Sequence, residues 1–91
     1  DYGDALNSIG KLLLDQGRYD EAIPYLTKAA ENPLFRENFQ PLTNLGVLHY
    51  KRGQLRIAET FLDRAVSAAP DRACVAYYYR GHLRLKESRF K

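Results

Sequence analysis

The sequence predicts an all-α fold made of repeated pairs of antiparallel helices, because two stretches of the chain carry the same pattern. Residues 6–33 and 42–70 each contain two glycines seven residues apart, an alanine five residues after the second glycine, and another alanine seven residues later. The apolar residues recur at the spacing of one helix face. Repetition at a fixed period indicates units that stack on one another. The matching positions are Leu6, Ile9, Gly10, Gly17, Tyr19, Ala22, Leu26 and Ala29 in the first stretch, and Leu42, Leu45, Gly46, Gly53, Leu55, Ala58, Leu62 and Ala65 in the second.

The first unit begins with a helix predicted over residues 4–16. Asp4 is a suitable N-terminal cap, and Leu6, Ile9 and Leu13 share the side that we expect to be buried. Gly17 ends this helix, because glycine adopts the left-handed conformation of a tight helix C-terminus at little steric cost.

A second helix is predicted over residues 19–31. Gly10 and Ala22 are small because two antiparallel helices approach closely only where no bulky side chain stands between them. Pro24 removes one backbone hydrogen bond, so we expect a slight bend near the first turns and not a break. The residues expected to face inward are Tyr19, Ala22, Ile23, Leu26, Ala29 and Ala30.

The link between the two units is longer than a simple turn. Gly10 and Gly46 are 36 residues apart, and the extra length of this spacing lies in residues 32–40. Pro33 stops the second helix, whereas Phe35 and Phe39 are more apolar than a solvated loop requires. We therefore expect an elongated turn whose aromatic side chains dock back on the repeat.

The second unit predicts helices over residues 38–52 and 55–68, the latter ended by Pro70. Residues 71–91 then repeat only the first half of the pattern, so this last helix lacks a partner helix. Because terminal repeats need a polar outer face, we expect the chain to be a segment of a longer repeat protein. The positions that correspond to Leu42, Gly46, Gly53 and Leu55 are Tyr77, Gly81, Ser88 and Phe90, and Tyr77 is expected in the core at the repeat junction.

This pattern resembles the tetratricopeptide repeat (TPR), a helix-turn-helix unit of about 34 residues with small residues where the helices touch. The resemblance covers nearly the whole chain. It implies a right-handed superhelix whose concave face, built by the first helix of each repeat, holds a peptide or a helix of a protein partner. The repeats would span residues 3–38 and 39–72, with a partial third repeat over residues 73–91.

The first repeat also resembles the PilF-type pilotin lipoproteins of type IV pilus systems. Pilotins are lipidated at an N-terminal Cys, lie on the inner face of the outer membrane, and help the pilus secretin to assemble. The resemblance implies a secretin subunit as partner and a periplasmic location at that membrane; otherwise a cytoplasmic location is expected. No lipidation motif is present, and Cys74 lies inside a repeat. The similar residues are Asn7, Gly17, Arg18, Tyr19, Glu21, Ala22 and Ala29, then AENPLF at 30–35 and NLG at 44–46.

Alignment of the units places a mainly apolar strip on the face that TPR proteins use for ligands. An exposed apolar groove rimmed by charge usually marks an interaction surface, and a partner helix could occupy it directly. Some of these side chains could alternatively only pack against a neighbouring turn. The strip consists of Asn7, Lys11, Leu14, Thr43, Val47, Tyr50, Tyr78, His82 and Leu85, with Asn44 beside it.

Charge is unevenly distributed along the chain. Residues 1–45 have four basic and seven acidic side chains, a net charge of −3, whereas residues 46–91 have ten basic and four acidic side chains, a net charge of +6. This polarity suits end-to-end stacking or an acidic partner near the C-terminal part. The chain has no apolar run long enough to cross a bilayer, so we expect no direct membrane insertion by this segment.

Other functions find less support in the residues. A TPR clamp for a C-terminal carboxylate is not assembled, because Val75 and Tyr79 stand where that clamp has basic residues. The run Tyr77–Arg80 could suggest stacking on nucleic acid, but consecutive helical residues point about 100° apart and form no common platform. His49 and His82 lie on different helices and have no ligand partner at metal-binding spacing. We therefore expect no enzyme, no metal and no cofactor in this segment, although an enzyme that carries it as an appendage stays open, as does a general TPR adaptor.

Overall fold

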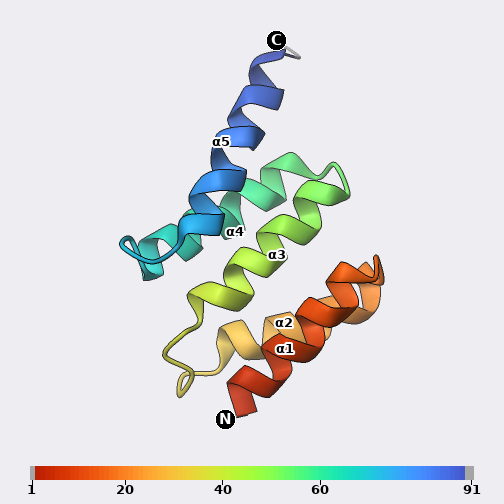
Figure 1. Ribbon diagram of the computed structural model, residues 1–91, viewed down its shortest axis with the longest axis vertical. Helices are drawn as coiled ribbons and strands as arrows, with labels where there is room; N and C mark the ends of the chain where they lie inside the picture. Colours follow the sequence, from red (N-terminus) through yellow and green to blue (C-terminus); the bar gives the residue numbers. More distant parts are fainter. Residues whose placement is uncertain (1, 90–91) are drawn as a thin grey trace.

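The computed structural model describes residues 2–89, which form five α-helices and no strand. The all-α prediction is therefore confirmed. Figure 1 shows α1 paired with α2 and α3 paired with α4, stacked in one row with α5 against the second pair. The bounds are α1 (Tyr2–Asp15), α2 (Tyr19–Glu31), α3 (Phe39–Lys51), α4 (Leu55–Ala68) and α5 (Cys74–Arg89).

Two glycines reverse the chain within the helix pairs. Gly17 and Gly53 have φ angles of 75° and 79°, a region that residues with a side chain rarely adopt. After α1, the amide of Gly17 donates to Leu14 and the amide of Arg18 donates to Leu13, at N···O distances of 2.9 Å. These bonds satisfy carbonyls at the helix end that would otherwise lack a partner. The predicted role of Gly17 as a helix terminator is thus confirmed.

Two further glycines let the paired helices touch. A Cβ atom placed on Gly10 would lie 2.5 Å from the Cγ of Leu26, and one placed on Gly46 would lie 2.7 Å from the Cγ of Leu62. Contacts this short do not occur between real side chains. The leucine of the second helix therefore occupies the space that a larger residue would need, as the small-residue pattern predicted.

The core is continuous from one helix pair to the next. Leu14, Leu26 and Leu48 belong to one buried cluster shared by α1, α2 and α3. Leu62 and Leu83 belong to another cluster, shared by α3, α4 and α5. Because each pair buries its apolar side chains against the next pair, stability depends on stacking as well as on the pairs themselves.

Three local predictions for the first pair can be compared with the structure. Leu6 is buried, but Ile9 is 43% exposed, so the prediction of a buried Ile9 is wrong. Among residues 2–89, only α2 and α3 pack on α1, so part of its surface has no helix against it. Asp4 lies in the first turn of α1 and is not its cap, because the helix already begins at Tyr2. α2 continues through Pro24 without a break, as predicted.

The long link docks on the first repeat through one aromatic side chain. Phe35 is buried in a cluster with Leu6 and Ala29, and a Cβ atom on Gly3 would lie 2.5 Å from the Phe35 ring. Asn32 shapes the preceding turn, since its side-chain oxygen accepts a hydrogen bond from the amide of Leu34 at 3.0 Å. The prediction that aromatics of this link dock back is confirmed for Phe35.

α5 packs on α3 and α4 with a different side from the one expected. Ala76 and Leu83 are buried and Tyr79 is partly buried, whereas Tyr77 is 42% exposed. The prediction of Tyr77 in the core is wrong, because it points to the side where a second helix stands in the earlier repeats. The expectation for Phe90 lies outside the described residues.

Candidate partner-binding surface

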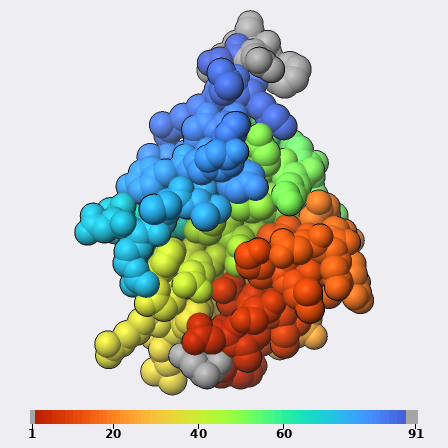
Figure 2. Space-filling view, viewed as in Figure 1, coloured from red at the N-terminus to blue at the C-terminus, as the bar shows by residue number. Residues whose placement is uncertain are grey.

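A depression on the described surface lies between α1, α3 and the connection from α4 to α5. We call it the hollow; its volume is about 260 Å³. Figure 2 shows α3, in yellow-green, on the floor between α1 and the beginning of α5. The residues that line it are Asn7, Lys11, Phe39, Gln40, Thr43, Asn44, Arg72, Ala73, Cys74 and Val75.

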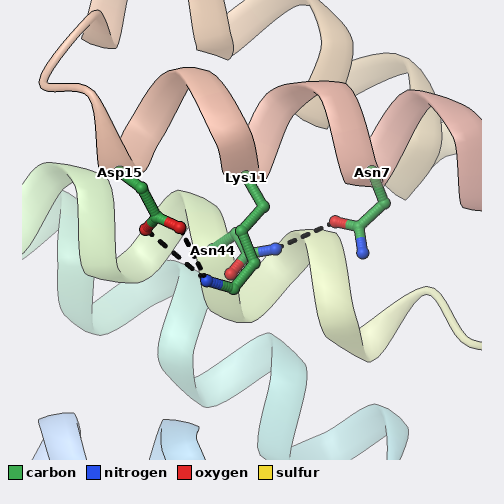
Figure 3. A network of polar contacts seen from close by, with 4 residues as sticks. All are labelled: Asn7, Lys11, Asp15 and Asn44. Atoms are coloured by element: carbon green, nitrogen blue, oxygen red, sulfur yellow. Dashed lines mark hydrogen bonds and ion pairs between the residues drawn. The ribbon is translucent and has the colours of Figure 1, made fainter.

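A chain of side-chain amides runs along one wall of the hollow. The Nδ2 of Asn44 donates to the Oδ1 of Asn7 at 2.9 Å, and the Nδ2 of Asn7 donates to the Oε1 of Gln40 at 3.3 Å. Asn7 is only 8% exposed, so these bonds satisfy a buried polar group. Figure 3 shows Asn7 and Lys11 pointing from α1 toward α3, where Asn44 meets Asn7.

The two ends of this amide chain keep unused hydrogen-bonding capacity. Within residues 2–89, the Nε2 group of Gln40 has no acceptor and the Oδ1 of Asn44 has no donor. An amide offers two donor hydrogens and two acceptor lone pairs. The wall of the hollow therefore presents one free donor and one free acceptor, the combination that a peptide group requires.

Two cations stand at the rim of the hollow, each in an exposed ion pair. The Nζ of Lys11 lies 3.1 Å from a carboxylate oxygen of Asp15 (Figure 3). Arg72 donates to Glu37 at 2.6 Å and lies over the ring of Phe39, with its guanidinium carbon 5.1 Å from the ring centroid. Exposed pairs of this kind contribute little to stability, so either cation can turn to an acidic group of a ligand.

Apolar side chains complete the hollow. Phe39, Ala73 and Val75 lie along it, and Val75 is 54% exposed. Cys74 is exposed beside them. The surface thus combines amide groups, two cations and a small apolar part, which suits a segment of polypeptide better than a purely apolar or purely charged ligand.

The structure divides the predicted strip into groups. Asn7, Lys11, Thr43 and Asn44 line the hollow, although the Thr43 hydroxyl donates within α3 to the Phe39 carbonyl at 2.7 Å. The repeat alignment put Leu14 and Val47 on the ligand face, but they belong to the buried core instead and offer almost no surface. They turn inward because α1 and α3 contact each other there.

The remaining predicted residues lie on α5 and on the adjoining part of α3. Tyr78, His82 and Leu85 are exposed and, with Gly81, form a shallow depression of about 310 Å³. Tyr50 is partly buried, with its ring edge-on to Tyr79 at a centroid distance of 5.3 Å. The hollow and this part of α5 are therefore two surfaces and do not form one groove.

The sequence prediction missed Gln40, Arg72 and Val75. Gln40 precedes Thr43 and Asn44 by three and four residues, so helical spacing alone could have placed it on their face. Val75 stands where the TPR carboxylate clamp has a basic residue, and the repeat alignment does not place it on the ligand face. Arg72 comes from the turn after α4, and a turn residue has no periodic pattern that indicates its neighbours.

Three further features of the described residues concern metal ions, membranes and aromatic stacking. Within residues 2–89, no group of three or more His, Cys, Asp or Glu side chains is arranged to hold a metal ion. The helices of that part of the chain are also too short or too polar to cross a membrane. The Tyr77–Tyr79 run does not form a flat stack, since Tyr78 and Tyr79 meet at an interplanar angle of 85°.

Comparison with known proteins gives one match. The sequence pattern of a family described as "Tetratricopeptide repeat" matches residues 13–80, which is more than half of the chain. No curated protein and no solved structure matches the chain.

Proposed function

The chain belongs to the tetratricopeptide repeat family of protein–protein interaction modules, and we propose that it holds an extended segment of a partner protein in the hollow. The observation that carries this proposal is the amide chain of Asn44, Asn7 and Gln40, with a free acceptor at one end and a free donor at the other. Main-chain groups of an extended peptide would complete both hydrogen bonds.

The surroundings of the amide chain favour a segment with an acidic and an apolar side chain. Lys11 and Arg72 lie at the rim and already bind exposed carboxylates of this chain. A carboxylate of the partner can replace either one at little cost, because exposed ion pairs contribute at most about 1 kcal/mol. The exposed Val75 supports an apolar contact beside them.

This proposal predicts that the free amide groups control affinity for peptides. Peptides would be selected from a random displayed library on the 91-residue chain, and their dissociation constants measured by calorimetry. We expect Gln40→Ala combined with Asn44→Ala to weaken binding roughly thirtyfold, since two hydrogen bonds of about 1 kcal/mol each are lost. Gln54→Ala, an amide at the turn after α3, is the matched control and should leave affinity unchanged. Equal affinities for all three proteins would reject the hollow as the site.

The pilotin-like role is a more specific form of this proposal. This role is supported by the resemblance of residues 30–35 and of the first repeat to the PilF-type pilotins. No relative among the compared proteins adds to that support. In this role the chain would act at the periplasmic face of the outer membrane and hold an apolar segment of a pilus secretin subunit; as a general adaptor it would act in the cytoplasm.

The secretin role predicts binding that survives added salt. An apolar contact in the hollow should persist at about 0.5 M salt, whereas docking through the charged ends should weaken, because exposed charges are screened within a few ångströms there. Val75→Glu should abolish capture of a purified secretin subunit, while the exposed Tyr25→Glu on α2 should not. Undiminished capture by Val75→Glu, or no capture by the unchanged chain, would end the secretin role and leave the general peptide-binding proposal intact.

A further inference from the structure

Gly81 is the counterpart of Gly10 and Gly46, but no side chain of residues 2–89 packs on it. A Cβ atom on Gly10 or Gly46 would collide with a leucine of the partner helix, whereas a Cβ atom on Gly81 would meet no atom within 4 Å. The residues around Gly81 are exposed as well: Tyr78, His82 and Leu85, the last at 57%. We call these four residues the α5 strip. They follow the spacing i, i+3, i+4, i+7 of one helix face and lie opposite the buried Ala76 and Leu83.

A second uncovered apolar face lies at the opposite end of the stack. Tyr2, Ala5, Ile9 and Leu12 are exposed and share one side of α1. We call them the α1 strip. Figure 1 shows α1 and α5 at the two ends of the row of helices, with α3 between them. Exposed apolar faces of this kind usually mark interaction surfaces.

The charges at the two ends are complementary. The half of the chain that contains α1 carries a net charge of −3 and the half that contains α5 carries +6. Beside the strips, Asp4 on α1 and Arg84 on α5 are exposed and have no ion-pair partner within residues 2–89. Opposite charges at matching surfaces favour encounter in one orientation and disfavour contact between two like ends.

We propose that the α5 strip of one copy of this chain binds the α1 strip of a second copy, head to tail. Gly81 then receives a bulky side chain of the incoming helix, as Gly10 receives Leu26 and Gly46 receives Leu62. The contact joins two different surfaces, so each copy keeps one free strip at either end of a dimer. Such an interface continues into open filaments, or closes into a ring where the rotation per copy allows it.

Two complementary variants test this arrangement. Ile9→Glu removes the α1 strip and Leu85→Glu removes the α5 strip; both side chains are exposed, so the fold should persist, as helical circular dichroism can check. In sedimentation at increasing concentration, the unchanged chain should grow beyond a dimer and either variant alone should stay monomeric. An equal mixture of the two should form a dimer and nothing larger. In that dimer the intact α5 strip of Ile9→Glu binds the intact α1 strip of Leu85→Glu, and no other intact strip remains.

Other outcomes overturn the proposal. A monomeric unchanged chain at about millimolar concentration would show that the strips do not bind each other. A dimer that persists in Ile9→Glu but is lost in Leu85→Glu would show that two α5 strips pair symmetrically. Should either variant misfold, Leu12→Glu and Tyr78→Glu, which change other exposed members of the two strips, replace them under the same criteria.

Discussion

At the scale of single residues, three glycines at the same repeat position have different surroundings. Gly46 and Gly10 lie under a leucine of the partner helix, and Gly81 faces open space. The same residue type thus has a packing role at two sites and, within the described residues, none at the third. Replacement by alanine therefore tests the steric effect of an added methyl group at Gly10 and Gly46. At Gly81 it tests the effect on helix propensity alone.

Replacing these glycines should have opposite effects on stability. We expect Gly46→Ala to lower the free energy of unfolding by about 1–3 kcal/mol, because the new methyl group forces Leu62 out of its position. Gly81→Ala should raise it by about 0.5–1 kcal/mol, since alanine is the better helix former and meets no neighbour. Urea unfolding followed by circular dichroism measures both values. A destabilised Gly81→Ala would contradict the open surroundings described for α5, and an unaffected Gly46→Ala would contradict the packing of α3 on α4.

Another prediction at this scale concerns a charge pair. Two hydrogen bonds of 2.7 Å from Arg18 lower the pKa of the Glu21 carboxyl below its ordinary value, and the same pair raises the pKa of Arg18. Because the pKa of Glu21 is lower in the folded state, its contribution to stability is present above the unfolded pKa. The contribution is lost as pH falls through the folded pKa.

Carbon-detected NMR titration of the Glu21 side chain measures this shift. The pKa of Glu21 should lie below its ordinary value in the unchanged chain and should return to that value in Arg18→Ala. The effect on stability should be small, because both side chains are exposed to solvent and screened by it. A pKa of Glu21 that is the same in the unchanged chain and in Arg18→Ala would show that the ion pair does not form in solution.

At the scale of helices, the first helix of each pair builds the hollow. α1 supplies Asn7 and Lys11, α3 supplies Gln40 and Asn44, and the beginning of α5 supplies Val75. The second helices α2 and α4 support these from behind through Leu26 and Leu62. A ligand in the hollow would therefore contact three helices at once, and its affinity would depend on their relative positions.

Helix existence and helix contacts were largely predictable from the sequence, but exposure at the ends of the stack was not. The positions of Gly17, Gly10 and Leu26 follow from local turn chemistry and from spacing. Ile9 and Tyr77 have the same pattern as buried residues in the other repeats, yet they are exposed. A periodic pattern indicates which face of a helix is apolar, whereas burial of that face depends on whether another helix stands against it.

The residues of the hollow were predicted only in part, because the repeat pattern again does not show which residues a neighbouring helix buries. Alignment of the units identified Asn7, Lys11 and Asn44 because these residues share a face with their counterparts in the next repeat. It also included Leu14 and Val47, which the contact between α1 and α3 buries. Arg72 reaches the hollow from a turn, where it contacts Glu37 and Phe39, and no periodic pattern indicates such neighbours.

At the scale of the whole molecule, the hollow lies between two unlike ends. The hollow presents amide groups and rim cations, whereas the α1 and α5 strips are apolar and lie in halves of the chain that carry opposite net charge. These surfaces involve different residues, so peptide binding and head-to-tail association can be abolished separately. Gln40→Ala with Asn44→Ala should leave association unchanged, and Leu85→Glu should leave peptide affinity unchanged.

The most direct test of the binding account is an NMR titration of the side-chain amide signals with a library-selected peptide. The signals of Gln40 and Asn44 should shift with the peptide in saturable fashion, because their free donor and acceptor gain partners. The signals of Gln16 and Gln54, at the turns within the helix pairs, should stay in place. Shifts confined to Gln16 and Gln54, with Gln40 and Asn44 unmoved, would contradict the assignment of the hollow as the binding site.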